Sequence, residues 1–276
     1  MLSRILVAVA GIPLLILLYA SGGIWHYFLV FVVSAMGLYE YYTMAQGDGR
    51  NPYKYPGIVL SLLLLSFKYF GGPRYSGDAF VAAFVLISLL TLLRGDLVNV
   101  NQDFGVTLTG ILYIYLFSFV FNIAALPRGN SWLVLTQIAV WVCDSFAFFT
   151  GATLGRKFFK EGLTEISPKK SKEGAIGGVL FTVLCVLILA ETGLFPGADM
   201  GLTDGAGQLR YGFVIGYALV AALACEIGDL VESIIKRGFH AKDSGALLLG
   251  HGGFLDRFDS LIFVLPVISL FLRLFA

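Results

Sequence analysis

Charged side chains recur at helical spacing between residues 226 and 237, where a long apolar run ends. At about 100° per residue, five polar residues fall within a stripe about 100° wide: Glu226, Asp229, Ser233, Lys236 and Arg237. Five apolar residues of the same run lie outside that stripe: Leu223, Ile227, Val231, Ile234 and Ile235. Carboxylates at membrane depth are costly and usually line a functional cavity. A structural ion pair is the alternative, but two acids and two cations on one stripe favour a functional site.

A glycine-rich segment follows, in which Gly252 and Gly253 precede Asp256 and Asp259. Glycines allow backbone N–H groups to approach phosphate oxygens closely. The two aspartates are three residues apart at the predicted start of the last helix, so we expect them to share a face. Paired carboxylates beside basic residues suit Mg²⁺ bridged to substrate phosphates. A glycine turn before a helix cap is also common without any such site, and His251 either caps the turn or contacts phosphate.

An earlier apolar run contains an acid, Asp144, and ends with Gly151 and Gly155. Small residues at this spacing are typical of close helix packing, which does not account for Asp144. The loop at 166–174 is basic and includes Ser167, Lys169 and Lys170. This loop is either a solvated face attracted to anionic lipid or a clamp for the phosphates of a nucleoside triphosphate or a lipid. Spacing alone leaves both interpretations open.

Apolar runs make up most of the chain and must position these residues. Of the 276 residues, 58% are hydrophobic and only 13% are charged, about half the charged share of a soluble domain. We predict an all-α, polytopic transmembrane bundle of about nine helices, with the runs near 55–70 and 79–93 short for a full span. The runs lie near 5–20, 24–45, 55–70, 79–93, 106–126, 131–150, 174–195, 211–233 and 255–275. The motifs divide the chain into N-terminal helices, 1–105, and a catalytic region, 106–276.

Lysine and arginine are distributed unevenly between the two sides of such a bundle. If each run crosses once, most of the 19 Lys and Arg residues lie on the side of the N-terminus. That side holds the loops near 46–54, 94–105, 152–173 and 233–257. Since loops rich in Lys and Arg stay in the cytoplasm, we predict a multi-pass protein of the cell inner membrane. Its N-terminus and its motifs would face the cytoplasm.

These motifs together resemble the signature of the phosphatidate cytidylyltransferases, also called CDP-diglyceride synthases. The longest match runs from 233 to 259, and the stretches 144–147 and 167–174 look like two further motifs of that family. The motif resemblance covers about 144–260, and the hydrophobic layout extends it to the whole chain. One departure is Leu249, where the family pattern has proline or glycine two residues before the histidine.

The resemblance implies transfer of a cytidylyl group from CTP to phosphatidic acid in the lipid bilayer, with CDP-diacylglycerol and pyrophosphate as products. It also implies a divalent cation such as Mg²⁺ and suggests a homodimer. The residues assigned to the metal are Asp229, Asp256, Asp259 and, less centrally, Asp144. Lys236 and Arg237 join the first three as catalytic residues. The residues assigned to substrate are Lys242, Asp243, His251, Gly252, Gly253, Arg257, Ser167, Lys169, Lys170 and Asp144.

Two other functions fit part of the pattern. A CTP-dependent polyprenol or phytol kinase would share the membrane setting, CTP and the metal, but it would need a group that deprotonates an alcohol. A membrane transporter would show inverted repeats with paired broken helices, whereas the charged motifs cluster in the second half of the chain. The net charge of +1 and the apolar composition argue against nucleic acid as a partner.

Overall fold

The computed structural model describes residues 2–71, 76–95, 98–195, 200–245 and 252–276. In this described part the chain is helical and forms no β-sheet, so the all-α prediction is confirmed. The helices are α1 (Leu2–Ser21), α2 (Ile24–Gly47), α3 (Lys54–Phe70), α4 (Ser76–Arg94), α5 (Val100–Tyr115), α6 (Phe119–Ala124), α7 (Gly129–Leu154), α8 (Lys172–Glu191), α9 (Tyr211–Gly238) and α10 (Asp259–Phe275). Two 3₁₀ turns, η2 (Leu116–Ser118) and η3 (Leu255–Arg257), interrupt the chain before α6 and α10.

Each of the nine predicted apolar runs coincides with helix. Among the described residues, six helical segments are long and apolar enough to cross a membrane: Ile24–Gly47, Gly77–Arg94, Val100–Ala124, Gly129–Leu154, Lys172–Glu191 and Tyr211–Gly238. Helices α3 and α10 have 17 residues each, slightly fewer than the roughly 20 that a bilayer core requires. The structure therefore supports a polytopic membrane protein with six clear candidate spans.

Two compact units divide the chain, and each is discontinuous in sequence. The first unit comprises residues 1–18, 23–121 and 235–258, and the second comprises 19–22, 122–234 and 259–276. Helix α9 contributes residues to both units. The division at residue 105, which we based on where the motifs lie, stays a prediction.

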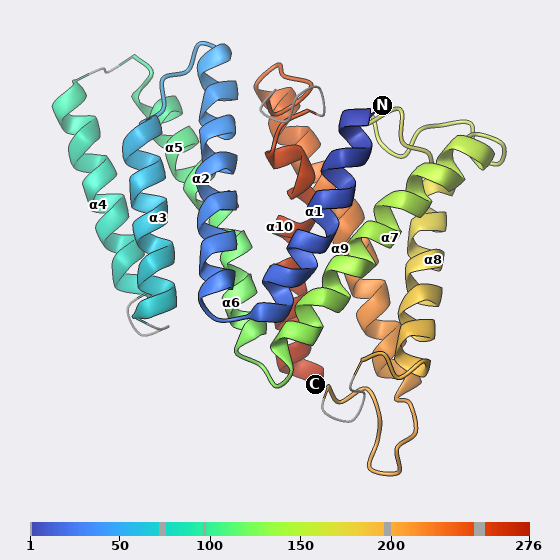
Figure 1. Ribbon diagram of the computed structural model, residues 1–276. Helices are drawn as coiled ribbons and strands as arrows, with labels where there is room; N and C mark the ends of the chain where they lie inside the picture. Colours follow the sequence, from blue (N-terminus) through green and yellow to red (C-terminus); the bar gives the residue numbers. More distant parts are fainter. Residues whose placement is uncertain (1, 72–75, 96–97, 196–199, 246–251) are drawn as a thin grey trace. The chain divides into compact units, whose positions relative to one another are not determined.

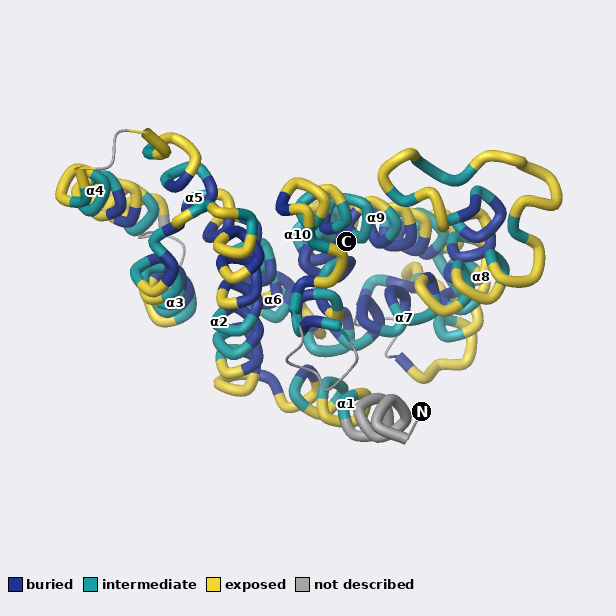
Figure 2. Tube along the Cα trace, turned by 90° about the horizontal axis from the view of Figure 1, so that it is seen from above, coloured by how far each residue is buried: buried dark blue, intermediate teal, exposed yellow. Residues whose placement is uncertain are grey.

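Helix α2 is the centre of the first unit. It packs against α3, α5, η2 and η3, whereas α4 packs against α3 and α5 (Figure 1). In the candidate span of α2, 61% of the residues are buried inside the protein, against 11% in the candidate span of α4. Figure 2 shows the same contrast. The close approach of α2 to α5 requires Gly110, where a Cβ would lie 2.8 Å from the Tyr42 ring. Tyr42 also donates a hydrogen bond to the Thr107 carbonyl at 2.8 Å. The exposed apolar side chains of α4 are therefore suited to lipid.

Helices α7 and α8 lie side by side in the second unit (Figure 1). Their backbones approach closely at Gly174 and Gly177 of α8. A Cβ at Gly174 would lie 2.8 Å from the Ala147 carbonyl oxygen, and one at Gly177 would overlap the Thr150 side chain. Gly151 also lies at this contact, since a Cβ there would be 3.2 Å from Ser171 Oγ and 3.7 Å from the Gly174 Cα. Small residues thus set the α7–α8 distance.

We expect Gly177→Ala to destabilise the protein by about 1–3 kcal/mol, the usual cost of overpacking. The added methyl group would meet the Cβ of Thr150 itself, and rotation of the Thr150 side chain does not move that atom. Gly212 of α9 is a matched control, since nothing lies within 4 Å of a Cβ there. Gly212→Ala should be neutral or slightly stabilising. Thermal unfolding in detergent measures both, and equal midpoints would contradict the packing role of Gly177.

The prediction that the last helix begins near residue 255 is wrong. Leu255–Arg257 forms a separate 3₁₀ turn, and α10 begins at Asp259. At the start of this turn, the N–H groups of Phe254 and Leu255 donate to the carboxylate of Glu40, 2.8 Å away in each case. Asp256 and Asp259 therefore do not share one face of a continuous helix, and they belong to different units.

Candidate active site

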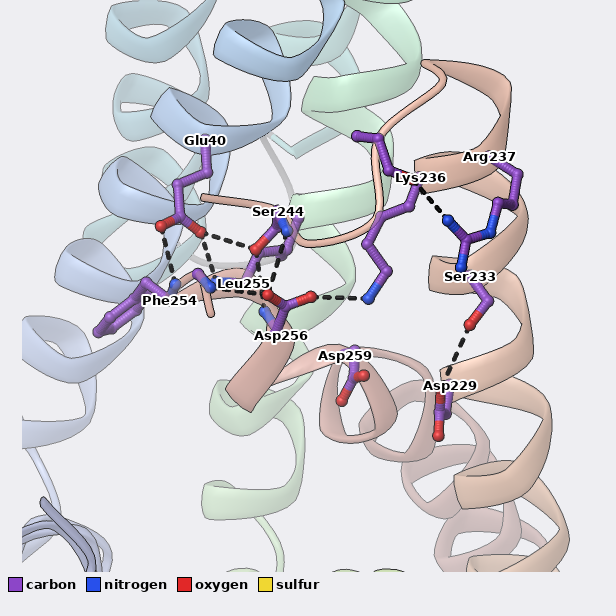
Figure 3. A network of polar contacts seen from close by, with 12 residues as sticks. Glu40, Asp229, Ser233, Lys236, Arg237, Ser244, Phe254, Leu255, Asp256 and Asp259 are labelled. Atoms are coloured by element: carbon purple, nitrogen blue, oxygen red, sulfur yellow. Dashed lines mark hydrogen bonds and ion pairs between the residues drawn. The ribbon is translucent and has the colours of Figure 1, made fainter. Parts of the chain in front are cut away.

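Asp256 is the centre of a polar cluster in the first unit (Figure 3). Its Oδ1 accepts a hydrogen bond from Lys236 Nζ at 2.6 Å. Its Oδ2 accepts from the N–H groups of Gly253 at 2.7 Å and of Ser244 at 3.1 Å. Burial raises the pKa of Asp256, but the hydrogen bonds from Lys236 and from the two N–H groups outweigh it, so the pKa lies below its ordinary value. Asp256 is therefore a carboxylate at neutral pH.

Glu40 of α2 is a second carboxylate in this cluster, and it is 2% exposed. Its Oε1 accepts from Phe254 N, and its Oε2 accepts from Leu255 N and, at 3.0 Å, from Ser244 Oγ. Glu40 is not among the site residues predicted from the sequence. The signal for it is an acid inside an apolar run of membrane length, which marks a functional position by default.

Glycines in the signature segment, by which we mean the described residues 244–245 and 252–258, make room for these two carboxylates. A Cβ at Gly245 would lie 2.6 Å from Glu40 Oε1, and a Cβ at Gly253 would overlap Ser244 Oγ. Gly252 has φ +79°, which favours glycine. The glycine N–H groups were predicted to approach phosphate, whereas the Gly253 N–H donates to Asp256. Substrate contact by Gly252 and Gly253 stays a prediction.

Lys170 is the centre of a second cluster, in the second unit. Its ammonium lies 2.5 Å from Asp229 Oδ2 and 3.6 Å from Glu226 Oε2. Burial lowers the pKa of Lys170, but the charges of Asp229, Glu226 and Asp144 outweigh it and the pKa is raised. Asp144 in turn accepts a hydrogen bond from Cys225 Sγ at 3.2 Å. The structure thus brings Lys170, Asp229 and Asp144 together, three of the predicted site residues.

The loop before α8 folds back and fixes the position of Lys170. Ser171 caps α8 by accepting from Gly174 N at 3.1 Å. Glu173 Oε1 accepts from the N–H groups of Phe158 and Phe159 at 2.9 and 2.8 Å. These contacts give Lys170 a partly buried position, with 26% of its side chain exposed, while the neighbouring Lys169 is exposed to solvent. The Ser167 carbonyl accepts from the Lys170 N–H at 3.1 Å.

Helix α10 approaches α9 next to Asp229. A Cβ at Gly228 would lie 3.0 Å from the Ser260 carbonyl oxygen, so the residues adjoining Asp229 and Asp259 are in contact. Asp259 begins α10, and its Oδ1 accepts from Ser260 N at 2.6 Å. The second unit therefore holds Asp144, Asp229 and Asp259 on neighbouring helices.

The predicted polar stripe of α9 is confirmed by the exposure of the opposite face. Leu223, Ile227 and Ile234 are 52%, 47% and 50% exposed, as expected for side chains in contact with lipid. Asp229 and Ser233 are half-buried, with Ser233 Oγ 3.5 Å from Asp229 Oδ1 (Figure 3).

The remaining predicted residues lie at the surface or outside the described part. Exposed side chains belong to Arg237, Lys242, Asp243 and Arg257. Arg237 donates to the Ala241 carbonyl at 3.0 Å. His251 and Leu249 lie outside the described residues.

Both clusters offer the hard oxygen ligands that Mg²⁺ prefers. Within the described ranges, no group of three or more His, Cys, Asp or Glu side chains is arranged to hold a metal ion alone. Protein-bound Mg²⁺ usually takes one or two carboxylates and completes its shell with water and substrate phosphates. The donors present therefore fit an ion that arrives with a nucleotide better than a permanent metal centre.

The sequence matches one protein family and is similar to three proteins of the same name. The model of the family described as "Cytidylyltransferase family" matches residues 2–275. The chain is 29% identical to the phosphatidate cytidylyltransferase of Bacillus subtilis (strain 168), over 100% of this chain and 99% of that protein. It is 31% identical to the protein of the same name from Synechocystis sp., over 98% and 96% of the two chains. A third such protein, from Staphylococcus aureus (strain COL), is 30% identical over 79% of each chain.

Proposed function

The chain belongs to the cytidylyltransferase family, and from that premise we propose that it transfers a cytidylyl group from CTP to phosphatidic acid. A phosphate oxygen of phosphatidic acid attacks the α-phosphorus of CTP. The bond from that phosphorus to the bridging oxygen of the β-phosphate breaks, and pyrophosphate leaves as CDP-diacylglycerol forms. The near full-length similarity to relatives named phosphatidate cytidylyltransferase carries this proposal.

The chemistry of the residues agrees with this reaction. The lipid phosphate is already a nucleophile, so no strong general base is needed. The task of the protein is to hold two anionic substrates together and to stabilise the charge that develops on pyrophosphate. Lys236, held by Asp256 at 2.6 Å, is a fixed positive charge for this purpose. The exposed Arg237, Lys169 and Lys242 are suited to contact with phosphates at the surface.

We propose Asp229, Asp256, Asp259 and Asp144 as ligands of Mg²⁺. When bound, the ion would neutralise negative charge on the phosphate oxygens of CTP. Asp256 already accepts three hydrogen bonds, so it would offer one of its roughly four lone-pair sites to an ion.

Incubating membranes with CTP labelled in the cytidine moiety tests the function. Cytidylyl transfer moves the label into the lipid fraction when phosphatidic acid is present. A CTP-dependent kinase transfers only the γ-phosphate, so with a polyprenol as acceptor the cytidine label would remain in water and a γ-phosphate label would enter the lipid. Cytidine label that enters the lipid fraction only with phosphatidic acid supports the proposal. Transfer of the γ-phosphate to the alcohol, without any cytidylyl transfer, would contradict it and identify a CTP-dependent kinase instead.

We further propose nine membrane spans in the inner membrane, with the N-terminus and the motifs in the cytoplasm, and a homodimer in the bilayer. The orientation rests on the lysine and arginine distribution, and the dimer rests on the resemblance to the family. Two exposed positions report the orientation: Lys242, and Gly205, where nothing lies within 4 Å of a Cβ.

In a background without the three native cysteines, Lys242→Cys should react with an impermeant thiol reagent only after the membrane is opened. Gly205→Cys should react in intact cells. Labelling of both positions from the same side would contradict this arrangement.

A further inference from the structure

We infer that Glu40 is a positioning residue of the transferase, which holds the signature segment in the shape that orients Asp256. The inference rests on the proposed function and deepens it. Glu40 lies on α2, more than 200 residues before the segment it contacts, with separations of 204, 214 and 215 residues. Nothing in the resemblance to the family assigns it a role.

The three donors to Glu40 determine the local backbone. Phe254 N and Leu255 N are consecutive, and both point at the same carboxylate. A buried carboxylate is tolerated only when such donors satisfy it. These two hydrogen bonds anchor the start of η3, which begins at Leu255, to α2. This turn is what places Asp256 beside Lys236.

Ser244 links the two carboxylates. Its hydroxyl donates to Glu40 Oε2 at 3.0 Å and accepts from Asp256 N at 3.3 Å, while its own N–H donates to Asp256 Oδ2 at 3.1 Å. Removing Glu40 therefore removes the acceptor of the Ser244 hydroxyl, and a rotated hydroxyl no longer supports Asp256. Figure 3 shows Glu40, Ser244 and Asp256 as one connected network.

The packing leaves this network little freedom to adjust. Gly253 and Gly245 lie so close to Glu40 that a Cβ at either position would be 2.6 Å from one of its carboxylate oxygens. Close-packed interiors do not absorb such changes without movement. A change at Glu40 should therefore shift the segment as a unit rather than alter one side chain.

Glu40→Gln tests the role with little change of shape. The amide offers one acceptor oxygen and one donor group to three donors, so at least one N–H of Phe254 or Leu255 loses its acceptor. We expect kcat to fall about ten- to a hundredfold, as for other small misplacements of reacting groups. The apparent KM for CTP should change by less than about threefold, because the exposed basic residues that meet the nucleotide are untouched.

Tyr42→Phe is the matched control. Tyr42 lies two residues further along α2, is buried, and donates to the Thr107 carbonyl, so the variant loses one buried hydrogen bond without touching the signature segment. A second variant, Ser244→Ala, covers the case in which Glu40→Gln fails to fold. It should lower kcat in the same direction, and combined with Glu40→Gln it should add less than its separate effect.

Hydrogen exchange of peptides covering 252–258 gives a readout that does not depend on activity. Glu40→Gln should exchange faster there than the wild type, and Tyr42→Phe should not. Unchanged kcat and unchanged exchange in Glu40→Gln would overturn the inference, as would equal losses of kcat in Glu40→Gln and Tyr42→Phe. If the wild type itself fails to form CDP-diacylglycerol, the proposed function fails, while the exchange data still decide the role of Glu40.

Discussion

Asp256→Asn should lower kcat for CDP-diacylglycerol formation by at least about 10²–10³-fold, by comparison with the loss of one group that stabilises developing charge. Asparagine has nearly the same shape, but it lacks the charge and presents an NH₂ group to its neighbours. In the wild type each hydrogen-bond partner of the Asp256 carboxylate is a donor: Lys236 Nζ, Gly253 N and Ser244 N. The amide would therefore point a donor at a donor, whichever way it turned.

The variant also removes the negative charge that holds Lys236, whose side chain is 12% exposed. An ammonium that loses its carboxylate partner in a partly buried position moves toward water. Asp256→Asn should thus remove both a proposed Mg²⁺ ligand and the orientation of a proposed catalytic cation.

The measurement is kcat as a function of Mg²⁺ concentration, on protein that elutes from gel filtration like the wild type. Asp78→Asn is the control, since Asp78 is an exposed acid at the start of α4, and it should leave kcat unchanged. Asp259→Asn tests Asp259, another proposed ligand, independently. Near-normal kcat with unchanged Mg²⁺ dependence in either site variant would exclude that aspartate as a ligand, and the same result in both would mean that the site is elsewhere.

Lys170→Met should lower kcat by about a hundredfold, the second-largest effect that we expect. The variant leaves the carboxylates of Asp229 and Glu226 facing each other without the ammonium that lies 2.5 and 3.6 Å from them. Like charges at such a site repel or take up a proton, and either change removes Asp229 from its wild-type state. Methionine keeps most of the aliphatic length, so the packing of the loop should be retained.

Two other lysines of the same loop separate this effect from a general loss of positive charge. Lys160 is exposed, and Lys160→Met should leave kcat and KM near the wild-type values. Lys169 is also exposed but is a proposed substrate contact, so Lys169→Met should raise the apparent KM for CTP or phosphatidic acid while kcat changes little. Kinetics in neutral detergent check all three variants. Wild-type kinetics for Lys170→Met would contradict a role in the active site and would favour the alternative, in which the loop is a solvated basic face attracted to anionic lipid.

The sequence alone determined the helical class and the polar stripe of α9. A continuous apolar run of nearly bilayer length favours a helix, which pairs its backbone polar groups within the segment, and each of the nine predicted runs is helical. The stripe of α9 followed from the 3.6-residue period, and the exposure of Leu223, Ile227 and Ile234 confirms it. Local spacing was sufficient in these cases because each concerns one helix.

Only the tertiary structure decided which acid meets which donor. Lys170 pairs with Asp229 of α9, 59 positions further along the chain, because the loop before α8 folds back and holds Lys170 in place. Glu40 accepts hydrogen bonds from the N–H groups of residues more than 200 positions away, and a separate 3₁₀ turn precedes the last helix where spacing alone predicted one continuous helix. Helical periodicity describes the order of residues around one axis, whereas these contacts depend on how closely separate helices pack, which is set by the volumes of side chains distant in sequence.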